Sequence, residues 1–141
     1  MSEGLSKEER DAVKQRAKEL RAQEKAGRNR EAGEKSVREA IAKLDAGDRE
    51  IGEGFYAVVS QVAPHLVPKT YYGMPGFAND EGKIVVFLQP AGKFSTRYST
   101  IGFEGRARLD DGDMWPTAFA VPAWTEGVAS RLTDLVRAAT R

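Results

Sequence analysis

The residues best suited to binding chemistry are aromatic and basic side chains in the second half of the chain. Lys93 and Arg97 lie four residues apart, a spacing that places both on one face of a strand. If the turn near Met74 lies beside that strand, we predict a groove for a small anionic ligand or a partner segment, with Arg97 as its bidentate hydrogen-bond donor. The alternative is a solvated charged strand beside a core aromatic cluster. The predicted lining is Tyr71, Tyr72, Met74, Lys93, Arg97, Tyr98 and Trp115.

A dense acidic cluster is the second candidate site. Asp110, Asp111 and Asp113 surround a glycine, and carboxylate oxygens are the ligands that iron and other hard metals prefer. The same residues are equally typical of a turn in which aspartates hydrogen-bond to the backbone. The spacing of a calcium-binding loop and its closing glutamate are missing. We therefore carry an iron or other metal site here as a prediction beside the turn interpretation, and otherwise expect no cofactor.

The sequence lacks the residue sets of the common catalytic mechanisms. There is no cysteine, which excludes disulfides, thiol nucleophiles and cysteine-ligated zinc. The single histidine, His65, has no second nitrogen ligand and no Ser-His-Asp spacing, so we interpret it as a surface or loop residue. The glycines before Lys83 do not have the spacing of a phosphate-binding loop. A non-enzymatic protein is therefore favoured over an enzyme.

Composition limits the class of protein further. The 141 residues include 22 basic and 21 acidic side chains, and a net charge of +1 argues against a dedicated nucleic-acid binder. The longest apolar run, Ile84 to Leu88, is too short to span a membrane. The first residues lead into a charged stretch without the apolar segment of an export signal. We expect a protein located in the cytoplasm.

Helical patterns occupy the first 63 residues. Ser6 and Glu9 form a capping box that starts a helix to about Lys25, and residues 26–33 are predicted to be a flexible linker with glycine near both ends. Two further helices are predicted over residues 36–46 and 49–63, with Asp48 as the N-cap of the later one. The last helix has an apolar stripe that is expected to face the sheet, formed by Ile51, Phe55, Val58, Val59 and Val62. Gly52 and Gly54 inside this helix indicate close packing.

This pattern predicts a division into residues 1–33 and a domain of residues 34–141. The first helix has only a narrow apolar stripe of Val13, Ala17 and Leu20, which can dock on a surface but cannot form a core. A second subunit is one such surface, so a homodimer is possible. Deleting residues 1–33 would then convert the dimer into a monomer.

The hydrophobic period changes after Pro64. Short strands are predicted at residues 69–72, 77–78, 83–89, 94–103 and 118–121, with a short helix at residues 104–109 and a terminal helix capped by Thr125. Strands in hairpin order flanked by helices indicate an α+β fold with an antiparallel sheet of about five strands. Both faces of residues 84–88 are apolar, so both need cover, from the chain itself or from a pocket or subunit contact.

The segment from Tyr71 to Phe77 has the residues of a tight connection. Met74 precedes a proline and is therefore extended, and Pro75-Gly76 fits the central positions of a type II turn. Tyr71 and Tyr72 should alternate across the preceding strand, which would place their rings on opposite faces.

This segment, with the strand at residues 83–89, closely resembles the YdhG-like family of bacterial domains of unknown function. The stretches 93–98, 101–103, 109–112 and 114–118 are similar to its actinobacterial type, and the resemblance covers about residues 36–141. It implies a two-layer fold with helices on one face of an antiparallel sheet, like secretion chaperones. Some members are described as frataxin-like iron chaperones. In this chain, however, acidic and basic residues alternate along the helices, which weakens the iron interpretation.

The favoured hypothesis is a non-enzymatic binding or interaction module, which would hold a small molecule or a partner segment near the Tyr71–Phe77 turn. An intracellular iron-binding chaperone is the alternative that the resemblance implies. An enzyme using aspartate, tyrosine and arginine as acid and base is a third hypothesis, and no spacing favours it.

Overall fold

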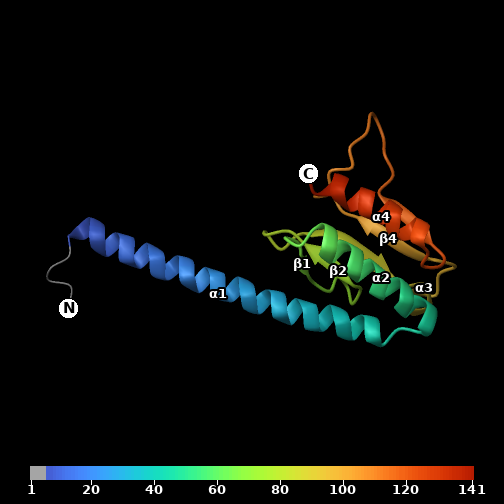
Figure 1. Ribbon diagram of the computed structural model, residues 1–141, viewed down its shortest axis with the longest axis horizontal. Helices are drawn as coiled ribbons and strands as arrows, with labels where there is room; N and C mark the ends of the chain where they lie inside the picture. The colour runs from blue at the N-terminus through green and yellow to red at the C-terminus, as the bar shows by residue number, and fades with distance from the viewer. Residues whose placement is uncertain (1–5) are drawn as a thin grey trace. The chain divides into compact units, whose positions relative to one another are not determined.

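The computed structural model describes residues 6–141, apart from the side chains of residues 22 and 23. The chain divides into two compact units between Ala32 and Gly33. The elements in chain order are α1 (Lys7–Ala42), α2 (Ala46–Val62), β1 (Val67–Pro68), β2 (Gly76–Ala78), β3 (Ile84–Gln89), α3 (Ala91–Phe94), β4 (Ser99–Phe103), β5 (Ala118–Val121) and α4 (Glu126–Ala139) (Figure 1).

The predicted capping box starts α1. The Glu9 N–H donates to Ser6 Oγ at 3.1 Å, and Ser6 Oγ lies 3.2 Å from a Glu9 carboxylate oxygen. The helix then continues without a break through residues 26–33, so the predicted linker is wrong. Two glycines cost about 1 kcal/mol each in a helix, but the alanine, arginine and glutamate residues around them are good helix formers. Val13 and Leu20 are exposed, and their docking on a second subunit stays a prediction.

The helix predicted over residues 36–46 is the last part of α1, and the boundary between α1 and α2 lies three to four residues earlier than predicted. The first helix ends at Ala42, and Asp45 rather than Asp48 occupies the N-cap position of α2. Asp48 lies in the first turn of α2, where its carboxylate accepts a hydrogen bond from the Gly92 N–H at 2.9 Å. Both aspartates are suitable N-cap residues, so the sequence alone could not decide between them. It also did not predict the hydrogen bond between Asp48 and Gly92.

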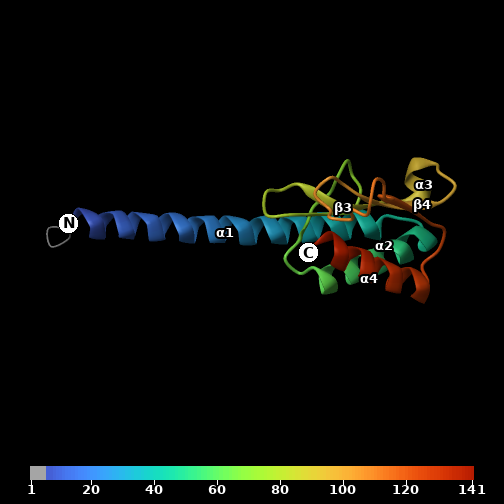
Figure 2. The same cartoon turned by 90° about the horizontal axis from the view of Figure 1, so that it is seen from above.

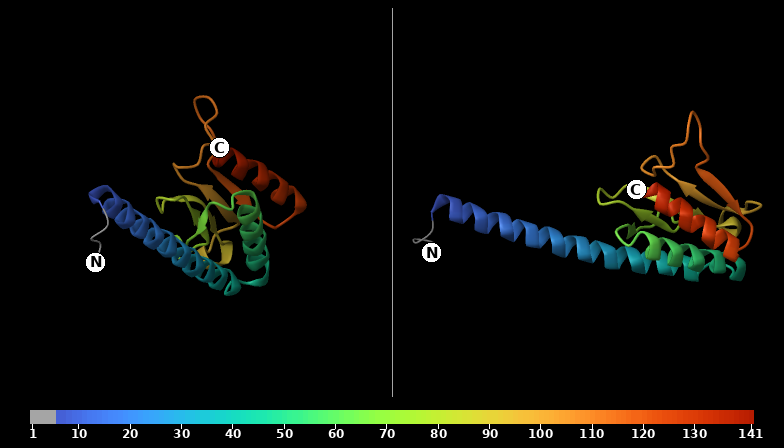
Figure 3. Two further views of the ribbon diagram at one scale, coloured as in Figure 1. Left: turned by 60° about the vertical axis from the view of Figure 1, so that its left-hand side comes forward. Right: turned by 45° about the horizontal axis from the view of Figure 1, so that its top comes forward.

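The second unit contains a five-stranded antiparallel sheet in the order β1-β2-β3-β4-β5. Helices α2 and α4 lie side by side on one face of it (Figures 2 and 3). This arrangement confirms the predicted α+β fold. Among the described residues, no helix is long and apolar enough to cross a membrane.

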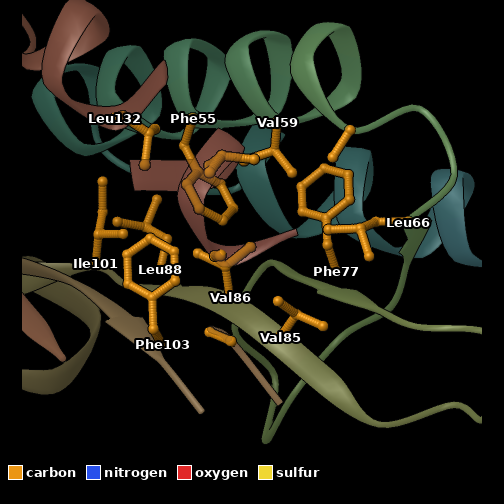
Figure 4. Packing of buried hydrophobic residues seen from close by; sticks show 14 of the residues in the cluster. Phe55, Val59, Leu66, Phe77, Val85, Val86, Leu88, Ile101, Phe103 and Leu132 are labelled. Atoms are coloured by element: carbon orange, nitrogen blue, oxygen red, sulfur yellow. The ribbon is translucent and has the colours of Figure 1, made fainter. Parts of the chain in front are cut away.

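The core lies between these helices and the sheet. Phe55 of α2 meets Phe77 of β2 edge-on, with 5.7 Å between ring centroids. The α2 stripe predicted from the sequence is largely buried, and α4 starts at Thr125 as predicted, with Thr125 Oγ1 accepting from the Val128 N–H at 3.2 Å. The other buried core residues shown in Figure 4 include Val59, Leu66, Val85, Val86, Leu88, Ile101, Phe103 and Leu132.

Two glycines of α2 allow close packing, as predicted. A Cβ at Gly54 would collide with the Trp124 indole, and a Cβ at Gly52 would lie 3.0 Å from the Ile41 side chain. These positions explain why helix-disfavouring residues occur in the middle of the most apolar helix of the chain.

Several predicted element bounds are wrong. Residues 94–98 do not belong to a strand, because residues 91–94 form the helical turn α3 and Ser95 ends it with a φ of 55°. Residues 104–109 form no helix and belong to the long connection between β4 and β5. Only two residues, Val67 and Pro68, form β1, and Tyr71 pairs with Met74 in an isolated bridge.

The chain itself covers the second face of β3 near Phe87. This partly buried ring lies over Gly102, its cross-strand partner, where a Cβ would collide with it. The Tyr71 ring also packs against Phe87, with 5.3 Å between ring centroids. Internal cover was one of the alternatives that the sequence left open, and it is the one found for Phe87.

Candidate functional site

The tight turn in the tyrosine segment is centred on Tyr72 and Gly73. Both residues have positive φ, 51° and 77°, as in a type I′ hairpin turn. The Tyr71 N–H donates to the Met74 carbonyl at 2.8 Å and the Met74 N–H donates to the Tyr71 carbonyl at 2.9 Å. The predicted type II turn at Pro75-Gly76 is therefore wrong. Gly76 instead lies in β2, where its hydrogen in place of a side chain allows close approach to the Lys69 carbonyl.

The two tyrosine rings lie together rather than on opposite faces, which corrects the sequence prediction. Their centroids are 4.8 Å apart, because the turn at Tyr72 breaks the alternation of a strand. Tyr71 is partly buried, whereas Tyr72 is 84 % exposed. Burial raises the pKa of Tyr71, and the nearby Glu104 carboxylate and Tyr72 raise it further. Tyr71 is thus a neutral packing residue, and Met74, which is buried, also packs in the interior.

Lys93 meets the turn, but Arg97 does not. Lys93 Nζ donates to the Gly73 carbonyl at 2.9 Å. Since Lys93 belongs to α3 and Arg97 to the loop after it, the two do not share a strand face as predicted. The Arg97 guanidinium lies 5.1 Å from the centroid of the Tyr98 ring. Within residues 6–141, no hydrogen bond, ion pair or ring contact joins Arg97, Tyr98 or Trp115 to the tyrosine turn.

A hollow of about 580 Å³ lies beside this turn, lined by Gly73 and Lys93 but not by Tyr71, Tyr72, Arg97 or Trp115. Its charged lining residues are Glu39, Asp45 and Asp48 against Lys43 and Lys93. Asp48 is already engaged, since it accepts from the Gly92 N–H at 2.9 Å and lies 3.5 Å from Ser99 Oγ. The surplus of carboxylates does not favour the anionic ligand that the sequence predicted for this region.

The remaining predicted residues lie on the surface. Asp110, Asp111 and Asp113 are exposed in the connection between β4 and β5, around Gly112 with its φ of 68°. Among the described residues, no group of three or more histidine, aspartate or glutamate side chains is arranged to hold a metal ion. His65 is an exposed loop residue after α2, as the sequence indicated.

A second hollow of about 580 Å³ lies between β5 and α4. Leu132 and Ile101 are buried in its lining, while Phe119, Val128 and Leu135 are partly buried. Arg131 is the only charged lining residue, and Ala118, Ala120, Val121, Thr125 and Gly127 complete the lining. We call this the β5–α4 groove. Most of its lining residues are apolar and one is a cation. The hollow beside the turn instead has lining residues of both charges.

One side of this groove is the free edge of the sheet. Strand β5 ends the sheet on one side, and among the described residues β4 is its only paired strand, with Ile101 opposite Phe119 and Gly102 opposite Ala118. The Phe103 N–H donates to the Thr117 carbonyl at 2.7 Å, which makes that pair a hydrogen-bonded one. Because bonded and non-bonded pairs alternate in an antiparallel ladder, Phe119 and Val121 bond to β4. The N–H and C=O groups of Ala118 and Ala120 therefore point away from the sheet.

The sequence analysis did not predict the β5–α4 groove, because the order of strands in a sheet cannot be read from the amino-acid sequence. Residues 118–121 were correctly predicted as a strand, but an edge position follows only from the folded topology. One available signal was the pair of prolines, Pro116 and Pro122, which bracket the strand, since proline in sheets concentrates at edges and ends.

No protein-family model matches this chain, and no curated protein or solved structure shows significant similarity to it. The resemblance to the YdhG-like family therefore stays a prediction from the sequence.

Proposed function

We propose that the protein is a non-enzymatic interaction module that binds an extended partner segment along β5, in the β5–α4 groove. The observation that carries the proposal is the free edge, where Ala118 and Ala120 direct their backbone N–H and C=O groups outward beside a depression with mostly apolar lining residues. A partner strand added to such an edge gains affinity from main-chain hydrogen bonds and specificity from side-chain pockets.

The edge of β5 has few of the features that prevent strand addition. Natural proteins protect free edges with charged side chains, proline or bulges. Strand β5 has the sequence Ala-Phe-Ala-Val, with no charged residue, and its pairing with β4 shows no register shift. Only its four-residue length and the flanking Pro116 and Pro122 limit the edge. These features support a short partner segment rather than a long one.

The proposed binding site, the β5–α4 groove, lies away from the tyrosine turn. The sequence predicted a groove between Tyr71, Arg97 and Trp115, and these side chains do not line the hollow beside the turn. Met74 and Tyr71 are engaged in packing, and Lys93 is bonded to the Gly73 carbonyl. Of the two ligand classes predicted from the sequence, we retain the partner segment. Its proposed binding site is at the β5 edge of the sheet and not at the tyrosine turn.

Selection from a random heptapeptide library, followed by binding measurements on the Ala120→Pro variant, tests this function. Proline removes the outward N–H of Ala120, which makes no bond to β4, so the fold should persist. We expect selected peptides to bind this variant at least about tenfold more weakly, through a lost hydrogen bond and contact with the proline ring.

Ala120→Ser is the matched control, because it changes the same side chain but keeps the backbone N–H. It should retain peptide binding, and the thermal unfolding of both variants should stay close to that of the parent protein. Peptides that bind the proline variant as tightly as the parent, or no enrichment of any peptide, would refute the proposed function.

A further inference from the structure

The ladder geometry fixes which residues of a partner strand would enter the β5–α4 groove. Ala118 and Ala120 would form the hydrogen-bonded pairs with an added antiparallel strand, because their polar groups face outward. Phe119 lies between them and would face a partner residue in a non-bonded pair, where side chains approach most closely. The partner segment is therefore limited to about five paired residues between Pro116 and Pro122.

The side chains of β5 also identify the groove face of the partner. Phe119 and Val121 point toward the core, where the Phe119 ring meets the Phe103 ring edge-on at 6.1 Å between centroids. Ala118 and Ala120 point to the other face and are exposed. A partner residue opposite Phe119, and those two positions before and after it, would project onto the same face as Phe119. Their neighbours in the groove are Val128 and Leu135.

Arg131 is the one charged residue in the groove lining that the side chains of a partner strand would meet. Arg131 is exposed, and its guanidinium lies 5.5 Å from the centroid of the Phe119 ring. Within the part of the chain that the structure describes, Arg131 makes no ion pair with a carboxylate. A guanidinium held over a ring beside the peptide path can bind a carboxylate by two parallel hydrogen bonds.

We infer that the partner is a peptide segment with apolar side chains at alternate positions and an acidic side chain that binds Arg131. The inference rests on the proposed strand addition and specifies the chemistry of the partner. Because side chains alternate between the two faces of a strand, the apolar side chains of the segment would lie in the groove. The acidic side chain would bind Arg131, the one cation that lines the groove. The other side chains of the segment would lie on the face of Ala118 and Ala120, which are exposed.

The sequences of the selected heptapeptides provide the first test. We expect aliphatic or aromatic residues separated by one position, with Asp or Glu among the residues of the same alternating set. Enriched peptides whose binding is lost in Ala120→Pro, but which show neither alternation nor an acidic residue, would overturn the inference and leave the proposed function intact. Absence of any peptide sensitive to Ala120→Pro would overturn both.

Substitution of Arg131 provides the second test. The tightest synthetic heptapeptide is compared with a version in which its acidic residue is replaced by the corresponding amide. This replacement should weaken binding to the parent protein about threefold to tenfold, within the range of a partly exposed ion pair, and should have no effect on Arg131→Gln. The matched control is Arg137→Gln, an exposed arginine on the same helix that does not line the groove. Equal losses in Arg131→Gln and Arg137→Gln would contradict a role for Arg131.

A second copy of this chain is the competing occupant of the edge. Strand β5 of one copy could pair with β5 of another, which would make the edge an assembly interface. Light scattering on the parent protein and Ala120→Pro distinguishes the two cases. We expect the same mass for both proteins, whereas a dimer that becomes a monomer in Ala120→Pro would overturn the peptide inference.

Discussion

The Arg131 guanidinium lies 5.5 Å from the centroid of the Phe119 ring, and this pair joins α4 to the edge strand β5. The Phe119 ring also meets the Phe103 ring edge-on, so it contacts both the exposed cation and the core. The groove therefore combines apolar side chains, a free backbone edge and one positively charged group. This combination is the basis of the proposed strand addition.

Arg131→Gln should have little effect on the stability of the fold. An exposed cation–π contact contributes about 0.5–1 kcal/mol, and glutamine keeps part of the side-chain packing. We expect the free energy of unfolding in urea to fall by no more than about 1 kcal/mol. A loss above about 3 kcal/mol would show that Arg131 holds the core together, and would contradict its assignment as a group available to a partner.

Gly54→Ala should destabilise the protein although alanine is the better helix former. The new methyl group would overlap the Trp124 indole, and overpacking costs about 1–3 kcal/mol against a helix-propensity gain of about 1 kcal/mol. Gly47→Ala is the control on the same helix, where nothing lies within 4 Å of the new methyl group. Denaturant unfolding should show a loss for the first variant and a gain of about 0.5–1 kcal/mol for the second. Stabilisation by both would contradict the packing of Trp124 on α2.

Helices α1, α2 and α4 also show what the sequence could predict. The apolar period of α2, the capping box at Ser6 and the cap at Thr125 are local patterns, and each was found where predicted. The five strands in hairpin order gave the fold class, because alternating patterns and turn residues are also local signals. The prediction from local sequence failed at glycines, because glycine is typical of linkers but also occurs within helices. Gly27 and Gly33 indicated a linker, and both lie within α1.

The candidate site could not be predicted, since it depends on which segments meet in space. Pro75-Gly76 has the composition of a turn, yet the residues with positive φ are Tyr72 and Gly73. A tyrosine is unusual in that conformation, so composition pointed to the wrong pair. The sequence correctly predicted that Lys93 lies near the tyrosine turn. It wrongly predicted that a strand positions this residue, which belongs to the short helix α3. The edge position of β5 had no signature of its own beyond the two flanking prolines.

Gly73→Ala should destabilise the tyrosine turn. A φ of 77° is unfavourable for alanine, and the new methyl group would lie 2.9 Å from Lys93 Nζ, which is bonded to the Gly73 carbonyl. We expect a loss of about 1–2 kcal/mol in the free energy of unfolding. Gly105→Ala is the matched loop control, because it has no positive φ and no neighbour within 4 Å. Equal stability of the two variants would contradict the turn at Tyr72-Gly73.

The raised pKa of Tyr71 predicts a loss of stability in alkaline solution. Burial, the Glu104 carboxylate and Tyr72 favour the neutral phenol in the folded state, so its pKa exceeds the ordinary value of 10.0. The folded state then retains a proton that the unfolded state releases, and stability falls as pH rises from about 10 toward the folded pKa. Urea unfolding at about pH 9 and about pH 11 should show a larger decrease for the parent protein than for Tyr71→Phe. An equal decrease would contradict this account of Tyr71.

The most direct test of the central claim is hydrogen exchange at the backbone amides of β5, measured by NMR. In the free protein, the amides of Phe119 and Val121 should exchange slowly and those of Ala118 and Ala120 rapidly, because only the first pair bonds to β4. Addition of the tightest selected heptapeptide should slow exchange at Ala118 and Ala120 and leave the Tyr71–Met74 turn unchanged. Slow exchange at all four amides in the free monomer, or protection at the turn instead, would contradict strand addition at this edge.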